Sequence, residues 1–275
     1  MGNSADDRAA EATTSPSVTV YGHRGARAHA PENTLLAFRL ALALGADGIE
    51  CDVQRTADGQ LVIIHDDKLN RTTNGRGPVA LRTLDELRAL DAGRGERIPT
   101  LAEVLALCQA ERCQVNLEVK AETLDAALAT AHAMEAALSR LDEPMRERVL
   151  VSSFELPAVA SLKQSLPWLR VATLHGGRRW RRADMLAPAL EMGAEAIHPG
   201  VSLVTPSLVR AAHERGVRVQ VWTANRWSTL RQLLGMGVDG VFSDYPERAV
   251  ITRMVGDATT GEPADGVQDE SGQRE

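Results

Sequence analysis

The amino-acid sequence predicts an α/β protein that folds as a single (β/α)8 TIM-type barrel, and three observations carry this prediction. Short apolar, β-branched runs alternate along the chain with segments of helical periodicity. The loops between them are short, and glycines follow several helical patterns just before the next strand. Residues 17–254 also match the roughly 250 residues that such a barrel needs. A doubly wound parallel sheet is the structural alternative.

Nine short runs have the composition of buried strands. In chain order they are Val18–Tyr21, Gly48–Val53, Leu61–Ile64, Val115–Val119, Val149–Ser152, Arg170–Leu174, Ala196–His198, Arg218–Trp222 and Gly240–Phe242. The barrel has places for only eight strands, so one run needs a separate explanation. Only Gln54–Gln60, with the turn signal Asp58-Gly59, separates the second run from the third. A parallel crossover needs a dozen or more residues, so we expect this pair to form an antiparallel hairpin.

Helices are expected between the strands. The clearest is Thr34–Leu44, with Asn33 or Thr34 as its cap and Gly45 at its end. The other strong helical patterns are Leu101–Gln109, Thr123–Leu138, Pro206–Arg215 and Trp227–Leu234. Residues 66–100 are polar and rich in Arg and Gly, with one short helix near Thr83–Leu90. We interpret them as a small insertion that follows the hairpin.

The two ends of the chain differ in composition from its body. Residues 1–16 and 255–275 are rich in small polar residues and acids, so we expect two disordered tails around a barrel at 17–254. The formal net charge is −6, and residues 255–275 alone hold six acids against one arginine. The body is therefore close to neutral. It gives no support to nucleic-acid binding, which needs a basic surface.

Cysteine content and apolar runs indicate the compartment. The three cysteines are odd in number and lack zinc-type spacing, which predicts free thiols in a reducing environment. The N-terminal residues lack the basic and apolar regions of a secretion signal. No apolar run approaches the ~18 residues of a membrane span. We therefore expect a soluble, cytoplasmic protein, and the sequence does not indicate its oligomeric state.

Two predicted strands place charged side chains where a barrel interior is normally apolar. Alternate strand residues share a face, so Glu50 and Asp52 point inward from one strand and Asn116, Glu118 and Lys120 from another. One interpretation is a buried ion-pair network around Lys120. The other is a metal site, because one lysine cannot neutralise three neighbouring carboxylates. All-oxygen ligation then selects one hard divalent cation such as Mg²⁺, Ca²⁺ or Mn²⁺.

Histidines at strand ends favour the metal site within a catalytic centre. His23 and Arg24 follow the first predicted strand, and His65 follows the hairpin strand. The loops at these ends supply the catalytic groups of barrel enzymes. A lone histidine is more often structural, but two of them beside three acids are a less ordinary combination. Histidine passes protons in either direction, and Arg24 with Lys120 suggests a phosphate ligand.

A series of short motifs, from about residue 17 to 250, carries a family resemblance. They are His23-Arg24-Gly25-Ala26, Pro31-Glu32-Asn33-Thr34, Glu50-Cys51-Asp52-Val53-Gln54, Leu61–Asp67, Leu69-Asn70-Arg71-Thr72-Thr73, Ile98-Pro99-Thr100-Leu101, Asn116–Lys120, Val151–Phe154 and Val221-Trp222-Thr223. With them the chain resembles the glycerophosphodiester phosphodiesterases, a family of PI-phospholipase-C-like barrels. Each motif alone is weak, but their order and spacing are specific. Cys51 departs from the family pattern, and since it faces the helices we expect no catalytic consequence.

The resemblance implies metal-dependent hydrolysis of a small glycerophosphodiester to sn-glycerol 3-phosphate and an alcohol. It implies metal ligands at Glu50, Asp52 and Glu118, an acid–base pair at His23 and His65, phosphate contacts at Arg24 and Lys120, aromatic contacts to the alcohol or glycerol at Phe154 and Trp222, and an orienting acid at Glu32. Glu32 has an alternative interpretation as a helix-entry acid favoured by the helix dipole. The two aromatic residues could equally be core. The sequence leaves open which histidine is the base, and whether water or a substrate hydroxyl attacks first.

Rival functions share the same barrel. A lysophospholipase D-type or sphingomyelinase D-like enzyme needs an apolar, aromatic entry loop, and residues 66–100 contain no aromatic residue. Gly176–Arg182 carries four arginines around Trp180 and fits either a lipid headgroup contact or a solvated loop. A non-catalytic phosphodiester-binding barrel would be expected to lack a histidine, and both are present. A metal-dependent amidohydrolase would lean on histidine ligands.

Overall fold

The computed structural model describes residues 18–177 and 184–258. The strands are β1 (Thr19–His23), β2 (Gly48–Arg55), β3 (Leu61–Ile63), β4 (Gln114–Val119), β5 (Val149–Ser153), β6 (Arg170–His175), β7 (Ala196–Pro199), β8 (Arg218–Val221) and β9 (Gly240–Ser243). The α-helices are α1 (Leu35–Ala43), α2 (Leu84–Arg88), α3 (Leu101–Glu111), α4 (Leu124–Leu138), α5 (Glu143–Arg146), α6 (Leu156–Ser165), α7 (Leu186–Met192), α8 (Pro206–His213), α9 (Trp227–Gly235) and α10 (Pro246–Ala258).

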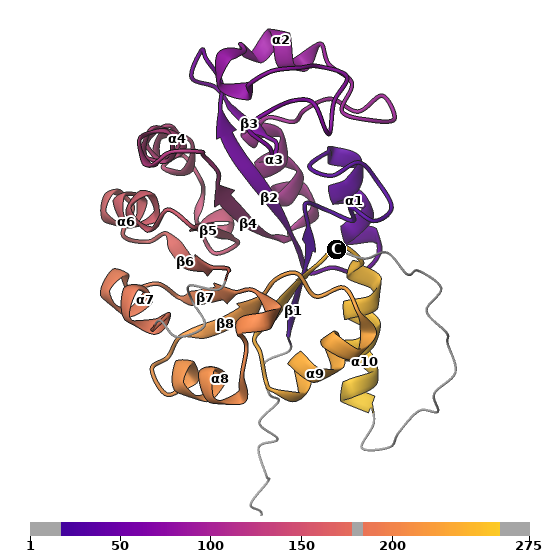
Figure 1. Cartoon of the computed structure of the whole chain (residues 1–275), viewed down its shortest axis with the longest axis vertical. Coiled ribbons are helices and arrows are strands. Elements are labelled where there is room, and N and C mark those ends of the chain that lie inside the picture. Colours follow the sequence, from indigo (N-terminus) through magenta and orange to yellow (C-terminus); the bar gives the residue numbers. More distant parts are fainter. Residues whose placement is uncertain (1–17, 178–183, 259–275) are drawn as a thin grey trace, which may run out of the picture.

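Eight parallel strands close into a barrel with helices around it (Figure 1). The strand order is β1-β9-β8-β7-β6-β5-β4-β2, and pairing of β1 with β2 closes the ring. The ninth strand, β3, pairs antiparallel with the end of β2, where Val53 lies opposite Ile63. The structure therefore confirms both the barrel and the hairpin that the short Gln54–Gln60 connection predicted.

The helix ends follow the predicted signals, but several helices were not foreseen. The Thr34 hydroxyl caps α1 by accepting from Ala37 N, and Gly45 then takes a left-handed φ of 90°. Helices α5, α6 and α10 were absent from the sequence prediction, whereas Gly193 had indicated the helix that is α7. Helix α10 runs to Ala258, so residues 255–258 are helical and the predicted tail boundary was too early. Adding one turn to a helix that already packs on β1 and α9 costs little free energy, because the helix is already nucleated.

The main apolar core lies between the barrel and its helices. Outward strand residues such as Ile49, Val115 and Val219 fill it, and so does Cys51. All three cysteines are buried and none forms a disulfide. Inside the barrel, a small apolar cluster of Leu150, Ala172 and Ala196 lies toward the amino-terminal ends of β5, β6 and β7. At the opposite end of the barrel interior, toward the carboxyl ends of the strands, charged and polar side chains occur together with aromatic ones.

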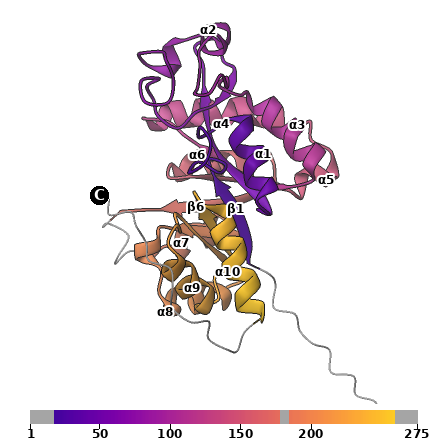
Figure 2. The same cartoon turned by 90° about the vertical axis from the view of Figure 1, so that its right-hand side faces the viewer.

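The segment 66–100 stands above the barrel with a small core of its own (Figure 2). Its buried residues include Leu69, Val79 and Leu87, which pack with Val62 and Ile64 at the hairpin. Helix α2 begins with a capping box in which Thr83 and Glu86 exchange hydrogen bonds. The insertion is thus a folded extension of the hairpin. No helix in the described part of the chain is long and apolar enough to cross a membrane.

Candidate active site

A cavity opens at the carboxyl ends of the barrel strands. It encloses about 420 Å³ of empty space, part of which is open to solvent. Nearly all of the side chains around it come from strand ends or the loops that follow them. They are His23, Arg24, Glu50, His65, Asn116, Glu118, Lys120, Phe154, Leu174, His198, Trp222 and Phe242. Eight of the ten predicted site residues line this cavity, and Asp52 and Glu32 lie directly behind it through contacts with Arg24.

Three carboxylates meet at the base of the cavity. Neighbouring strands β2 and β4 pair in parallel, with Asp52 opposite Glu118, and the pleat turns Glu50 to the same inner face. One oxygen atom from each of the three lies within 4.8 Å of the others. All three side chains are buried. The alternation read from the sequence therefore gathers one compact acidic cluster.

The cluster carries more negative charge than the neighbouring cations offset. Burial and the nearby charges of Asp52 and Glu118 raise the pKa of Glu50 well above its usual value. Burial, followed by the charge of Asp52, raises the pKa of Glu118 to about 7, although Lys120 and Arg24 oppose the shift. Without a further cation, the raised pKa values of Glu50 and Glu118 therefore favour protonated carboxyl groups in the cluster near neutral pH.

The residues of this cluster fit a hard divalent cation. Glu50 Oε1 and Asp52 Oδ1 are buried and accept no hydrogen bond from any described residue. Buried carboxylate oxygens without partners are costly unless something else compensates them. A set of carboxylate oxygens is the donor type that Mg²⁺, Ca²⁺ and Mn²⁺ prefer. Glu50, Asp52 and Glu118 would hold the ion.

His23 ends β1 and is held by a carboxylate from the far end of the chain. Its Nδ1 lies 2.7 Å from Asp244 Oδ1, and its Nε2 lies 4.0 Å from Glu50 Oε2. Asp244 also accepts from Asn225 Nδ2 at 2.8 Å. Burial would raise the pKa of Asp244, but the hydrogen bond and charge of His23 lower it below its usual value. The ionised Asp244 accepts the Nδ1 proton, so Nε2 is the nitrogen left toward the acidic cluster.

His65, like His23, is held by a carboxylate at its Nδ1. It follows β3, and its Nδ1 lies 2.7 Å from Asp66 Oδ1. Burial lowers the pKa of His65 below its usual value and outweighs the opposing charge of Asp52. The two histidines thus each keep one nitrogen on a carboxylate and the other nitrogen free for the cavity.

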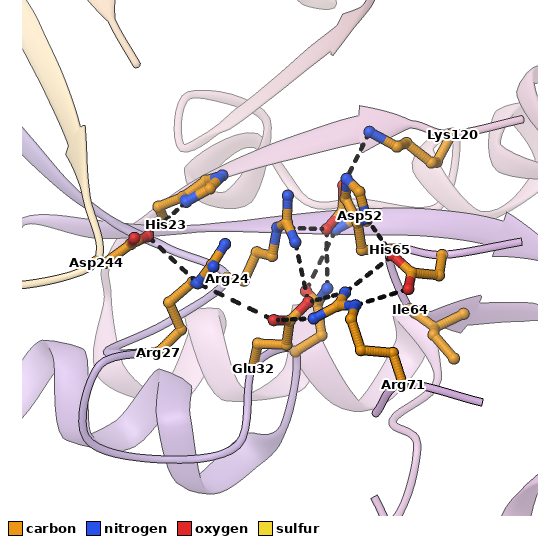
Figure 3. A network of polar contacts seen from close by, with 12 residues as sticks. His23, Arg24, Arg27, Glu32, Asp52, Ile64, His65, Arg71, Lys120 and Asp244 are labelled. Atoms are coloured by element: carbon orange, nitrogen blue, oxygen red, sulfur yellow. Dashed lines mark hydrogen bonds and ion pairs between the residues drawn. The ribbon is translucent and has the colours of Figure 1, made fainter. Parts of the chain in front are cut away.

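Arg24 is fixed by its backbone as well as by its side chain. It takes a left-handed φ of 56°, and its backbone N–H donates to Glu50 Oε2 at 2.8 Å. Its Nη1 donates to Glu32 Oε1 at 2.9 Å, and its Nε lies 3.3 Å from Asp52 Oδ2 (Figure 3). Gly25 follows at φ 81°, where a Cβ would meet backbone atoms of Ala37 at 2.6 Å. The tight His-Arg-Gly turn therefore depends on glycine.

Lys120 reaches the cluster from the end of β4. Its Nζ donates to Glu118 Oε1 at 2.9 Å and lies 3.8 Å from Asp52 Oδ1. Burial would lower the pKa of Lys120, but the charges of Glu118 and Asp52 raise it above its usual value. The ammonium has three N–H donors and uses one in the hydrogen bond to Glu118, so the others remain for an anion in the cavity.

Aromatic rings form the wall of the cavity away from the carboxylates. Phe154 and Trp222 meet edge to face with ring centroids 5.6 Å apart, and Lys120 Nζ lies 5.8 Å from the Phe154 ring. The indole of Trp222 donates to the His198 carbonyl at 2.8 Å. A Cβ on Gly176 would meet Trp222 at 3.0 Å, so the loop after β6 also presses on this wall. Positions 178–183, which hold most of Gly176–Arg182, lie outside the described residues.

Several residues of the site were not singled out in the sequence. Asp66 directly follows His65, so its place beside a candidate catalytic histidine was a signal in the sequence. Asp244 directly follows the last strand, at the same edge of the barrel as His23, so its position at a strand end was the signal in the sequence. Asn33 donates to Asp52 Oδ2 at 2.8 Å from a helix-cap position, and Arg71 lies within the insertion. Asn33 and Arg71 both lie in motifs that carry the family resemblance, but only the tertiary fold shows which site residues they contact.

Comparison with known proteins gives one consistent family. The sequence profile of the glycerophosphoryl diester phosphodiesterase family matches residues 23–248. The chain is 37% identical over 243 residues to a glycerophosphodiester phosphodiesterase of Caldanaerobacter subterraneus, which spans 84% of this chain and 96% of that protein. A Bacillus altitudinis enzyme of the same name is 36% identical over 245 residues, spanning 85% and 97%.

A solved structure adds a bound product. It is that of an Oleispira antarctica phosphodiesterase in complex with sn-glycerol-3-phosphate. The two chains are 31% identical and superpose with a TM-score of 0.79, over 86% of this chain and 96% of the other. The similarity extends over almost all of the barrel.

Proposed function

The chain belongs to the glycerophosphoryl diester phosphodiesterase family and is a phosphoric diester hydrolase, and on that premise we propose that it hydrolyses glycerophosphodiesters to sn-glycerol 3-phosphate and an alcohol with the aid of a divalent cation. One observation carries this proposal. Two histidines, each tied through Nδ1 to a carboxylate at 2.7 Å, flank a buried cluster of three acids in one cavity. A structural ion-pair network needs no such pair of proton carriers.

The cations of the cavity would bind and orient the phosphodiester anion. Lys120 has ammonium protons to spare, and Glu32 holds the guanidinium of Arg24 beside the cavity. Both lie beside the acidic cluster, so the non-bridging phosphate oxygens would be held there. A cation bound by Glu50, Asp52 and Glu118 supplies further positive charge, which offsets the charge that develops as the phosphoryl group is transferred.

The histidines would move the protons. One imidazole accepts the proton of the attacking hydroxyl at Nε2, and the other donates a proton to the departing alkoxide. Asp244 and Asp66 keep the two rings oriented and stabilise each when it is positively charged. The attacking hydroxyl belongs to water or to the substrate glycerol, and both routes use the same two histidines.

The aromatic wall would hold the organic part of the substrate. Phe154 and Trp222 present ring edges and faces to the cavity, with Leu174 and Phe242 beside them. Such surfaces suit the carbon skeleton of glycerol or of a small alcohol better than its charged phosphate. The phosphate would therefore lie toward Lys120 and Arg24, with the organic part toward the rings.

The proposal is tested by following glycerol 3-phosphate release from glycerophosphocholine and glycerophosphoethanolamine. The protein is first treated with EDTA and then supplied with Mg²⁺, Ca²⁺ or Mn²⁺. We expect no release with EDTA and restored release with at least one cation, and we expect Glu50→Gln to stay inactive under all conditions. Turnover of lysophosphatidylcholine without turnover of glycerophosphocholine or glycerophosphoethanolamine would instead support the lipid-directed alternative. Equal activity with and without EDTA would contradict the role of the cation.

A further inference from the structure

Arg71 joins two carboxylates that lie side by side next to the candidate site. Its Nη1 and Nη2 each donate to one oxygen of Glu32 at 2.8 Å. Its Nε donates to Asp66 Oδ2 at 2.7 Å, and Nη2 donates also to Asp66 Oδ1 at 2.9 Å. Both pairs are therefore two-pronged, and one guanidinium binds two anions. Figure 3 shows the pair of Arg71 with Glu32.

Each of these carboxylates also contacts a residue of the proposed mechanism. Glu32 accepts from Arg24 Nη1 at 2.9 Å, and Asp66 lies 2.7 Å from His65 Nδ1. The chain of contacts therefore runs from the phosphate-binding arginine to one of the proton carriers, with Arg71 at its centre. Arg71 itself does not line the cavity.

The central arginine comes from within the insertion, whereas Glu32 comes from a barrel loop and Asp66 from the point where the insertion begins after β3. Arg71 follows Leu69, which is buried in the separate core of the insertion. Glu32 lies in the loop between β1 and α1, and Asp66 follows β3. Arg71 thus ties the insertion both to the β1–α1 loop and to its own start beside His65, so the placement of the insertion bears directly on the geometry of the site.

The contact is stronger than an ordinary surface ion pair. The side chain of Arg71 is 46% exposed, which would normally make an isolated pair worth little. Its partners are more protected, at 11% exposed for Glu32 and 29% for Asp66. Burial would raise the pKa of Glu32, yet the hydrogen bonds from Arg71 and Arg24 lower it to about 2. Lysine could not reproduce the four hydrogen bonds, because they require the planar fork of arginine.

We propose that Arg71 is a positioning residue that sets Arg24 and His65 in register through Glu32 and Asp66. This inference rests on the proposed phosphodiesterase function. It assigns the insertion a role in turnover, since the insertion supplies the shared arginine. Arg71 exchanges no proton and touches no substrate, so its effect passes entirely through the two carboxylates.

Steady-state kinetics of four variants on glycerophosphocholine test the proposal. Asp66→Asn removes the direct contact to His65, so we expect mainly a lower kcat with KM closer to wild type. Glu32→Gln weakens the direct contact to Arg24, so we expect mainly a higher KM. Arg71→Gln should show both changes, with kcat/KM reduced on the order of 10²-fold, the usual cost of a misplaced catalytic group. Arg82→Gln is the matched control, because Arg82 makes an exposed ion pair with Glu86 in the same insertion, and it should behave as wild type.

Two further variants separate positioning from folding. The double variant Arg71→Gln with Asp66→Asn should have a kcat no lower than Asp66→Asn alone, because Arg71 acts on His65 only through the Asp66 carboxylate. Arg71→Ala should regain activity when guanidinium is added at low millimolar concentration, and Arg71→Lys should regain only a part. An additive double variant, or no rescue by guanidinium in a folded protein, would overturn the proposal. Wild-type kinetics in Arg71→Gln would overturn it too.

The proposed function can fail separately. If the wild-type protein released no glycerol 3-phosphate with any cation, the phosphodiesterase assignment would fall before any variant was compared. If the wild-type protein is active and Arg71→Gln matches it, only the inference about Arg71 falls.

Discussion

At the scale of single residues, the site depends on pairing each histidine with a carboxylate. A neutral imidazole can donate from either nitrogen, and the bond at Nδ1 selects one form. Asp244 selects it for His23 and Asp66 selects it for His65, each at 2.7 Å. The free Nε2 nitrogens then have a defined place, which proton transfer in both directions requires.

Replacing either histidine should separate turnover from cation binding. We expect His23→Ala and His65→Ala each to reduce kcat by about 10²- to 10⁴-fold, the usual contribution of a general acid or base. Cation binding, followed by calorimetry, should persist because the three carboxylates remain. A glycerol phosphodiester with a p-nitrophenol leaving group then identifies the acid, since that leaving group needs no proton. The variant that recovers on this substrate lacks the acid, and full activity of both variants would refute the assignment.

At the scale of elements, the turn after β1 shows how a loop is shaped for a catalytic side chain. Arg24 takes a left-handed φ of 56°, and the next residue, Gly25, takes 81°. A side chain at Gly25 would meet Ala37 on α1 at 2.6 Å. The turn places the Arg24 backbone N–H against Glu50 and the guanidinium against Glu32. The strained backbone conformation is therefore what positions both groups of Arg24 in the site.

Gly25→Ala should therefore destabilise the protein more than the same change at another left-handed glycine. The control is Gly216→Ala, where φ is 70° but no atom lies within 4 Å of the added Cβ. We expect the control to lower the free energy of unfolding by about 1 kcal/mol from backbone strain alone. Gly25→Ala adds a steric clash and should cost about 2–4 kcal/mol. Urea denaturation of both variants measures the difference, and equal losses would contradict the close packing of α1 against this turn.

At the scale of the whole molecule, the acidic cluster makes stability depend on pH and on cations together. The folded pKa of Glu118 is raised to about 7, and that of Glu50 is also raised. The folded state therefore keeps protons that the unfolded chain has already released. Without a cation, stability falls as the pH rises from the unfolded carboxyl value toward and through the folded one. A divalent cation would replace those protons and prevent the loss.

The increase in Tm caused by a divalent cation should therefore grow with pH. We expect a small increase at pH 5 and a larger one at pH 8, compared with the protein in EDTA. The difference should be several degrees, because 1 kcal/mol moves the Tm of a chain this size by about 2–4 °C. Differential scanning fluorimetry measures it. Glu118→Gln is the control that should weaken the pH dependence, and an increase independent of pH would refute the explanation.

The sequence by itself determined the features that arise within a few residues or from regular alternation. Strand and helix periods predicted the barrel, and a connection of seven residues, Gln54–Gln60, predicted the hairpin. Alternation along β2 and β4 predicted that Glu50, Asp52 and Glu118 share one face, as they do. These features follow from local geometry, which chain neighbours decide.

Only the tertiary structure decided which distant side chains meet. His23 and Asp244 are 221 residues apart and meet because β9 closes the barrel beside β1. Arg71 meets Glu32 across 39 residues because the insertion folds back over the β1–α1 loop. Such contacts depend on barrel closure and on how the insertion packs. Their energies involve pairs with no fixed spacing, so no local pattern in the chain records them.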